Sequence, residues 1–540
     1  MPAMNGYALW LLLCLLSVST IAGENPKWGD TRSRDWPAEC KQIAIPSTAD
    51  GKQQPAYFFR CISKNPRPLI VSLHTWSGDY RQKDALAPQC IADDYNYIHP
   101  DFRGPNRTPE ACGSDLVISD IDDAIDYAIN NAPVDTRSIH VIGVSGGGYA
   151  TLLTYMRSKH TIRTFSAWAS ISDIERWYYE SEGRKSKYAK DIAMATTGKK
   201  FSGDTYTMNP ESARQRSPLL MQTPVTKRAG SKLYITTGIH DGYTGSVPIT
   251  HSLRFYNKVV NDFDASQKDA LIPDEDILEM VVSRNFNTPR KDTLGGKVVH
   301  YRKRFSDKVQ LTIFEGTHEM LTDVALNHVR NAKKILAVGD SNGAFSYGWV
   351  RQLAHLRFHD WIYNTAISGN TVGFDNNNNE KLNTLRNIDR YMNEASTQLS
   401  GLDAIIIMLG SNDCKAVFTD RLERVPENLH TLIHKIKSNA IYKQYQPTIA
   451  IVSPPPYGPD DMLIAKYRHG GERIATLIPQ FKTLAEREQC IYINNYDRLK
   501  GIFEHVTTDG VHLTLEGQKL MATIINKALN EFLPQTPSLR

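Results

Sequence analysis

The chain has 540 residues, which is too many for one hydrophobic core and enough for two to four domains of ordinary size. Its composition, with 41% hydrophobic and 22% charged residues, is typical of a folded globular protein and excludes a disordered, collagenous or coiled-coil chain. The net charge of +5 is spread along the chain and the mean hydropathy is −0.40, so we expect neither a nucleic-acid partner nor a polytopic membrane protein.

The N-terminus has the pattern of a secretory signal peptide. The first 23 residues carry no charged side chain, Ala8–Leu16 is an unbroken apolar run, and small residues precede Glu24. This run is too short to span a bilayer, and a buried N-terminal helix is the alternative. We therefore expect residues 1–23 to be removed, the protein to be secreted or periplasmic, and no stable membrane insertion.

Six of the seven cysteines follow the predicted signal peptide: Cys40, Cys61, Cys90, Cys112, Cys414 and Cys490. An even number in an exported chain is compatible with disulfides. The four cysteines of the N-terminal half allow three pairings, and we predict Cys90–Cys112 because this bond would close a compact loop. Free buried thiols are the alternative. No CxxC or Cys/His spacing typical of zinc occurs, so the sequence predicts no metal and no cofactor.

A first candidate nucleophile lies between a strand and a helix. The apolar strand Ile139–Ile142 runs into Gly143-Val144-Ser145-Gly146-Gly147, which is followed by the helical stretch Tyr149–Met156. A G-x-S-x-G turn in this context exposes the serine hydroxyl above a sheet, and the first N–H of the helix can bind a developing oxyanion. We therefore predict Ser145 as a nucleophile and Gly146 as an oxyanion donor.

The expected partners of Ser145 follow in the order acid, then histidine. Asp241 comes after the strand-like run 233–237, and His318 comes after the alternating run 309–314. We interpret His240 as a loop residue and His251 as a helix-surface residue. Upstream, the strand 69–73 leads into a turn where the backbone N–H of Thr75 or Trp76 can complete an oxyanion hole.

Residues 40–330 resemble the α/β-hydrolase superfamily, especially its prolyl-oligopeptidase-like and polysaccharide-esterase branches. The segments LHTWSG, GVSGGG, GIHDGYTGSVP and FEGTHE carry the resemblance. It implies Ser145 as nucleophile, Asp241 as acid and His318 as base, with an inserted cap over residues 172–230. The aromatic residues Trp177-Tyr178-Tyr179 of that cap either pack in a core or stack on a substrate. In the expected oxyanion loop, this sequence has LHTW where many relatives have His-Gly. The sequence also lacks a propeller-length segment before this unit, which argues against a true oligopeptidase.

Four further segments occur in order between residues 339 and 513: Gly339-Asp340-Ser341, Ser368-Gly369-Asn370-Thr371, Gly410-Ser411-Asn412-Asp413 and Asp509-Gly510-Val511-His512-Leu513. The first and third follow short apolar strands, and the last precedes a helix at 514–529. Asp509 and His512, three residues apart, can share one loop and act on Ser341.

These four segments are similar to the blocks of the SGNH (GDSL) hydrolase family, over about residues 333–535. The resemblance implies a flavodoxin-like three-layer α/β/α unit with Ser341, Asp509 and His512 as the catalytic residues. The backbone N–H groups of Ser341 and Gly369 and the Asn412 amide then hold the oxyanion. Asp340 is expected to brace the turn, and Asp413 to be structural.

The sequence thus predicts an α/β protein with a signal peptide (1–23), an α/β-hydrolase domain (24–331) and an SGNH hydrolase domain (332–540). By family analogy, we expect an exported serine esterase with two sites, which removes acetyl or related acyl groups from an acylated polysaccharide or oligosaccharide. The alternatives are a lipase or phospholipase, or a single active SGNH esterase joined to a non-catalytic or peptidase-like N-terminal domain.

Overall fold

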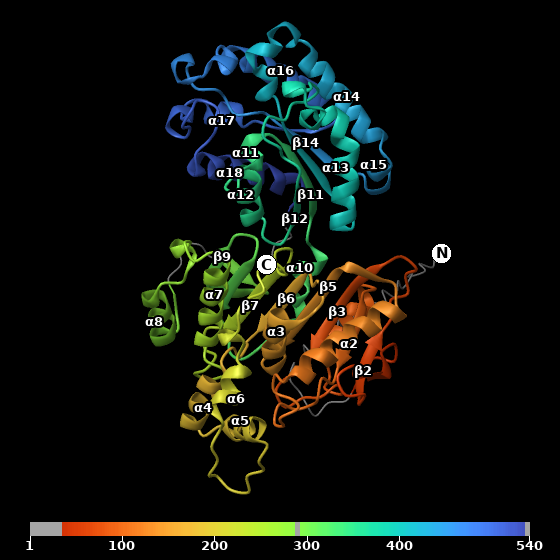
Figure 1. The fold of residues 1–540 in the computed structure, drawn as a ribbon, viewed down its shortest axis with the longest axis vertical. Coiled ribbons are helices and arrows are strands. Elements are labelled where there is room, and N and C mark those ends of the chain that lie inside the picture. The colour runs from red at the N-terminus through yellow and green to blue at the C-terminus, as the bar shows by residue number, and fades with distance from the viewer. Residues whose placement is uncertain (1–34, 287–291, 535–540) are drawn as a thin grey trace, which may run out of the picture.

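The computed structural model describes residues 35–286 and 292–534, which form two sheets with their own helices (Figure 1). The N-terminal unit extends from β1 to α10 and the C-terminal unit from β11 to α18. The predicted α/β fold class is confirmed. The predicted signal peptide lies outside the described residues, and the predicted boundary after residue 331 falls in the connection between α10 and β11.

The N-terminal sheet has ten strands in the order β1-β2-β4-β3-β5-β6-β7-β10-β9-β8. Its strands are β1 (Lys41–Pro46), β2 (Gln53–Phe59), β3 (Arg67–Leu73), β4 (Asn96–Pro100), β5 (Val134–Val144), β6 (Thr164–Trp168), β7 (Lys232–Gly238), β8 (Asp292–Leu294), β9 (Lys297–Phe305) and β10 (Val309–Phe314). The strands from β4 to β10 in this order are parallel, and both edges are antiparallel. The carboxyl ends of the parallel strands therefore lie along one edge of the sheet.

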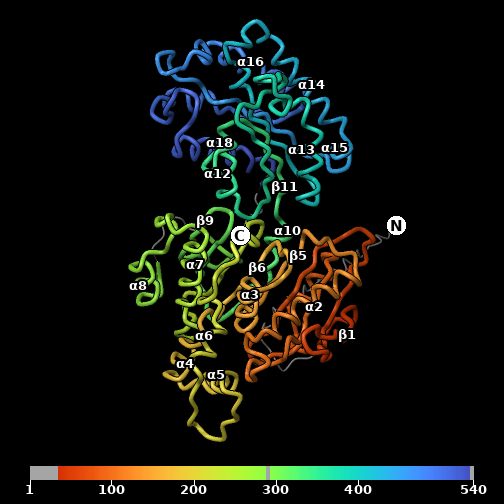
Figure 2. The backbone as a smooth tube through the Cα atoms, in the orientation of Figure 1, coloured from red at the N-terminus to blue at the C-terminus, as the bar shows by residue number. Residues whose placement is uncertain are grey.

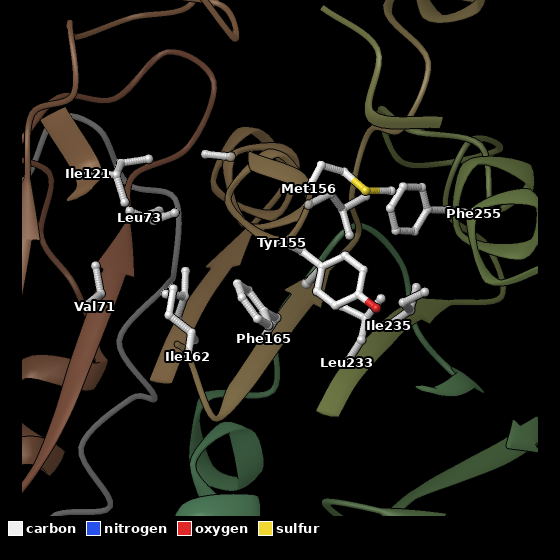
Figure 3. Close-up of a cluster of buried hydrophobic side chains, with 14 of the residues drawn as sticks. Val71, Leu73, Ile121, Tyr155, Met156, Ile162, Phe165, Leu233, Ile235 and Phe255 are labelled. Carbon is white, nitrogen blue, oxygen red and sulfur yellow. The ribbon is translucent and has the colours of Figure 1, made fainter. Parts of the chain in front are cut away.

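The helices of the N-terminal unit are α1 (Leu86–Ala92), α2 (Asp115–Asn131), α3 (Gly146–Arg157), α4 (Ile174–Gly183), α5 (Lys187–Thr197), α6 (Pro210–Gln215), α7 (Thr250–Phe263), α8 (Asp274–Ser283), α9 (Thr322–Ala325) and α10 (Asn327–Arg330). Figure 3 shows the core on one face of the sheet, where Phe165 and Leu233 of the central strands meet Tyr155 and Met156 of α3 and Phe255 of α7. The alternation of side chains along each strand directs these residues to one face.

The predicted cap is present as the insertion α4–α6 between β6 and β7, at the end of the molecule far from the C-terminal unit (Figure 1). Trp177 and Tyr178 are buried in a cluster with Trp76, whereas Tyr179 is 55% exposed. Core packing therefore explains the first two aromatic residues of the cap, and only Tyr179 presents its ring to solvent.

The C-terminal sheet is fully parallel, with five strands in the order β12-β11-β13-β14-β15. They are β11 (Lys334–Gly339), β12 (Trp361–Asn364), β13 (Ala404–Met408), β14 (Thr448–Val452) and β15 (Ile491–Ile493). The helices are α11 (Ser341–Ala344), α12 (Trp349–Leu356), α13 (Thr384–Leu399), α14 (Arg424–Ser438), α15 (Ala440–Tyr445), α16 (Gly470–Arg487), α17 (Tyr496–Lys500) and α18 (Leu515–Phe532). Apolar clusters on both faces of the sheet give the three layers.

The first strand, β11, lies between β12 and β13, so the chain runs outward from it in both directions. Open parallel sheets of this order bind ligands at the carboxyl end of the strand where the direction reverses. Asp340 comes directly after the end of β11, and Ser341 comes next, so Ser341 lies at this switch point.

The two units abut through the amino ends of their strands (Figures 1 and 2). Lys232, the first residue of β7, is buried and donates hydrogen bonds to the backbone carbonyls of Phe358 (2.6 Å) and Asp360. The Arg163 guanidinium, just before β6, lies 3.9 Å from the ring centroid of Trp361, the first residue of β12. Because the amino ends meet, the carboxyl ends of the two sheets point away from each other.

All six described cysteines are buried free thiols, so the predicted Cys90–Cys112 bond is wrong. Cys90 packs in the cluster beneath α1, and Cys112 packs in the separate cluster of the cap, which keeps the two sulfur atoms in different parts of the core. Among the described helices, none is both long and apolar enough to cross a membrane.

Candidate active sites

Ser145 forms a strained turn between β5 and α3. Its φ of 58° and ψ of −119° lie in a region that residues with a side chain rarely adopt. The Ser145 N–H donates to the Trp168 carbonyl (2.9 Å), which helps to hold this conformation. Gly143 and Gly147 allow the strand and the helix to approach closely, because a Cβ on Gly143 would lie 2.4 Å from the Gly147 carbonyl carbon. The predicted elbow is therefore present.

The two predicted oxyanion donors of this site lie against each other. A Cβ on Gly146 would lie 2.2 Å from the backbone nitrogen of Trp76. The N–H of Thr75, the other candidate, donates to Gln82 Oε1 (3.0 Å) and is therefore occupied. This leaves the Trp76 N–H as the second oxyanion donor. Gly146 is the first residue of α3, so its N–H has no acceptor within the helix. Two backbone donors from separate segments thus converge beside Ser145, as an oxyanion hole requires.

Asp241 and His318 meet at the carboxyl edge that also carries Ser145. They follow the adjacent parallel strands β7 and β10, and His318 Nδ1 lies 2.8 Å from Asp241 Oδ2. Asp241 Oδ1 accepts from the backbone N–H groups of Gly242 (2.9 Å) and Val247 (3.0 Å), which fix the carboxylate. The pair has the arrangement of an acid that orients a histidine base.

The rival histidines are held elsewhere. His240 Nε2 lies 2.8 Å from Glu315 Oε1, and His251 Nε2 lies 2.9 Å from Glu180 Oε2. His251 is only 2% exposed, so its interpretation as a helix-surface residue is wrong. Its face of α7 packs on the cap, and helical spacing alone did not reveal that contact.

In the C-terminal unit, the structure brings Ser341, His512 and Asp509 into one hydrogen-bonded chain. Ser341 Oγ lies 3.0 Å from His512 Nε2, and His512 Nδ1 lies 2.6 Å from Asp509 Oδ2. Burial raises the pKa of Asp509, but hydrogen bonds from the side chain and backbone of His512 and from the Val511 N–H outweigh it and hold this pKa below its usual value. Asp509 therefore stays ionised and favours a protonated imidazole during catalysis.

Asn342 and Gln518 tie the His512 loop to the serine turn, and sequence reasoning missed both. Asn342 Oδ1 accepts from the Leu513 N–H (3.0 Å) and from Gln518 Nε2 (2.8 Å), and Asn342 Nδ2 donates to the Val511 carbonyl (3.3 Å). Both side chains are fully buried. Only their positions next to Ser341 and after the His512 loop could have drawn attention to them.

The remaining oxyanion candidates lie on two loops that Asp413 joins. Gly369 adopts a φ of 88°, which favours glycine, and its carbonyl accepts from Asn376 Nδ2 (2.6 Å). Asp413, next to Asn412, accepts from the Val372 N–H with both carboxylate oxygens (3.0 and 3.1 Å). Burial raises the pKa of Asp413 to about 7. Asp413 is therefore a positioning residue that holds the Gly369 loop beside Asn412.

Asp340 braces the serine turn, as expected. Its carboxylate accepts from the Asn342 N–H (3.1 Å) at the start of α11, and burial raises its pKa. Each site residue that the sequence predicts thus lies at the carboxyl edge of its own sheet, and the two groups face in opposite directions.

Two family models match the chain, one in each unit. Residues 92–272 match the prolyl oligopeptidase family, and residues 336–520 match the GDSL-like lipase/acylhydrolase family. The chain is a serine ester hydrolase. The first match includes Ser145 and Asp241, and the second includes Ser341, Gly369, Asn412, Asp509 and His512. The predicted tandem of an α/β-hydrolase unit and a GDSL-type unit is confirmed.

Several solved structures resemble parts of this hydrolase. A carbohydrate acetylesterase from Sinorhizobium meliloti is 22% identical, with a TM-score of 0.32, and the match covers 37% of this chain and 99% of that chain. An aryl esterase from M. smegmatis is also 22% identical, with a TM-score of 0.31, and the match covers 37% of this chain and 99% of that chain. An acylaminoacyl peptidase from Pyrococcus horikoshii is 18% identical, with a TM-score of 0.34, over 52% of this chain and 37% of that chain. No curated protein matches the sequence.

Proposed function

We propose that this hydrolase is an exported esterase with two independent serine sites, which removes acetyl or related acyl substituents from polysaccharides. The hydrogen-bonded chain from Ser341 through His512 to Asp509 carries the proposal most directly. Support for export comes from the apolar N-terminal pattern, and support for a polymer with two kinds of ester comes from the two separate sets of residues.

The geometry supports acyl-enzyme chemistry at Ser341. His512 Nε2 takes the hydroxyl proton as Ser341 Oγ attacks the ester carbonyl carbon, and Asp509 stabilises the imidazolium that forms. The Gly369 N–H and the Asn412 amide are the proposed donors to the oxyanion. The tetrahedral intermediate then expels the sugar hydroxyl, which receives its proton from His512.

Water completes the cycle in the second half of the reaction. His512 removes a proton from water, the hydroxide attacks the acyl carbon, and Ser341 leaves with the proton that His512 returns. The same sequence of steps is proposed for Ser145, with His318 as base, Asp241 as its partner, and the Trp76 and Gly146 N–H groups as oxyanion donors. Because the two sites face apart, each is expected to work alone.

The proposal is tested with full-length Ser145→Ala, Ser341→Ala and double variants. Acyl release is measured from aryl esters of acetate and of a long-chain acid, from acetylated xylan and from acetylated pectin. Each single variant is expected to lose one part of the wild-type activity. In the double variant, the total activity is expected to fall at least about 1,000-fold. Wild-type hydrolysis by the double variant would show that the nucleophiles are wrong. A preference for long acyl chains would favour a lipase, and loss confined to one variant would indicate a single active site.

A further inference from the structure

A strongly cationic groove of about 620 Å³ lies beside the Ser341 site. Its lining includes one carboxylate, five asparagines and five cationic side chains: Arg386, Lys415, Arg421, Arg424 and Lys466. Three of these amides belong to the Asn376–Asn379 tract, which forms a short turn with left-handed backbone at Asn377 and Asn378. The groove therefore concentrates positive charge and hydrogen-bonding amides on one surface.

The groove adjoins both loops that carry the oxyanion candidates. Asn376, in its wall, donates from Nδ2 to the Gly369 carbonyl (2.6 Å). Lys415, also in its wall, follows Asn412 by three residues and donates its N–H to the Asn412 carbonyl (3.4 Å). A molecule bound in the groove would thus contact the residues next to the reacting ester.

Most of the positive charge in the groove is not neutralised by the protein. The one lining carboxylate, Asp375, is occupied by Arg386, whose Nε and Nη2 lie 2.9 Å from its two oxygens. The other four cations form no ion pair with any described residue, and three of them (Arg421, Arg424 and Lys466) are exposed. An arginine or lysine group in this state favours an anionic ligand.

Lys415 is the most informative of the four. The residue is only 6% exposed, and its ammonium group forms no ion pair with a described carboxylate. Burial and the neighbouring charge of Lys466 lower the pKa of Lys415, and the more distant charges of Asp413 and Asp340 only partly offset this shift. Both ammonium groups lie near the Tyr467 ring, at 5.6 Å for Lys415 and 5.1 Å for Lys466. An ammonium group on a mostly buried side chain without an ion-pair partner favours an anionic ligand.

We propose that this groove binds the anionic group of an acidic polysaccharide, so that the Ser341 site removes acyl groups from a polymer that carries carboxylate or sulfate. The inference rests on the proposed esterase function of Ser341 and defines its substrate class. The exposed amides of Asn377 and Asn378 suit sugar hydroxyls, which both donate and accept hydrogen bonds. The overall charge of +5 alone did not distinguish an acidic from a neutral polymer.

The test uses full-length protein with Ser145→Ala, so that only the Ser341 site contributes. Arg421→Gln/Lys466→Gln removes two exposed cations and is compared with Lys527→Gln, an exposed lysine of α18 outside the groove. The substrates are acetylated polygalacturonate, an acetylated and sulfated neutral polymer, and acetylated xylan. We expect the ratio of kcat/KM on an anionic polymer to that on xylan to fall at least tenfold in the groove variant, mainly through KM, and to stay constant in the control.

Lys415→Met is the second variant and is expected to shift the same ratio in the same direction. A loss restricted to polygalacturonate or to the sulfated polymer identifies the anion as carboxylate or sulfate. An unchanged ratio on both anionic polymers overturns the groove inference, provided that adding Ser341→Ala to the Ser145→Ala protein still abolishes acetate release. If the Ser145→Ala/Ser341→Ala protein still releases acetate at the rate of Ser145→Ala, the proposed function itself is wrong, and the two failures are therefore distinguishable.

Discussion

Replacing Gly146 by alanine tests how the Ser145 site is built. The added Cβ would lie 2.2 Å from the Trp76 nitrogen and 2.4 Å from the Trp76 Cα, whereas ordinary contacts are about 3.5 Å. Both clashing atoms belong to the backbone, so the two segments must separate by more than about 1 Å. Oxyanion donors act only within about 2.7–3.1 Å of the charged oxygen, and losing one costs about 10²–10³ in turnover, or about 3–4 kcal/mol.

We therefore expect Gly146→Ala to reduce turnover at Ser145 at least about 100-fold in a Ser341→Ala background. The assays are aryl acetate hydrolysis and the rate at which a fluorophosphonate labels Ser145, with circular dichroism to verify folding. Gly183→Ala is the matched control, because its Cβ would have no atom within 4 Å. If folded Gly146→Ala retains more than about a third of the parent rate, Gly146 and Trp76 do not form the oxyanion hole.

Three further predictions concern bracing, pH and the contact between the units. Asn342→Ala should lower kcat at Ser341 about tenfold and the free energy of unfolding by about 2–3 kcal/mol, because the Leu513 N–H loses its acceptor. Steady-state kinetics and urea unfolding measure the two effects. An unchanged kcat would contradict the prediction. Burial raises the pKa of Asp413 from 3.8 to about 7, so the folded chain retains a proton that the unfolded chain releases. The free energy of unfolding should accordingly decrease as the pH rises from about 4 to 7, by up to about 1.4 kcal/mol per pH unit. Asp413→Asn should reduce this dependence on pH when unfolding is measured by denaturant titration at several pH values. An equal dependence in the wild type and the variant would refute the reasoning. Lys232→Met should destabilise the folded protein by about 2 kcal/mol, because two carbonyls of the C-terminal unit lose their hydrogen-bond donor. Calorimetry checks this, with Lys527→Met as the control. Equal melting temperatures of the two variants would contradict the prediction.

Short-range patterns in the sequence were sufficient for the fold class and for most residues of both candidate sites. A buried strand followed by a small-residue turn and a helix identifies Ser145 and Ser341, because few other sequences can form so tight a turn. Asp509 and His512 are equally local, since three residues separate them. Asp241 and His318 are 77 residues apart, yet each could be predicted because it directly follows a strand of the same parallel sheet.

Interactions that depend on packing between distant segments were not predictable in the same way. Gln518 and Asn342 are far apart in sequence, and their contact exists only because α18 packs beside the serine turn. The Cys90–Cys112 pairing failed because proximity in sequence does not show which core cluster a side chain enters. The position of His251 failed for a related reason, since the cap covers its face of α7.

The sequence by itself determined that this chain has two α/β units, each with a serine on a strand-to-helix turn and an acid and a histidine in the expected order. These features depend on local backbone geometry and on hydrophobic periodicity, which a single sequence displays. Only the tertiary structure decided that the units meet at the amino ends of their strands, so that their sites face apart. It also decided that scattered cations and an asparagine tract gather beside Gly369, because loop packing brings together residues whose spacing in the sequence has no period.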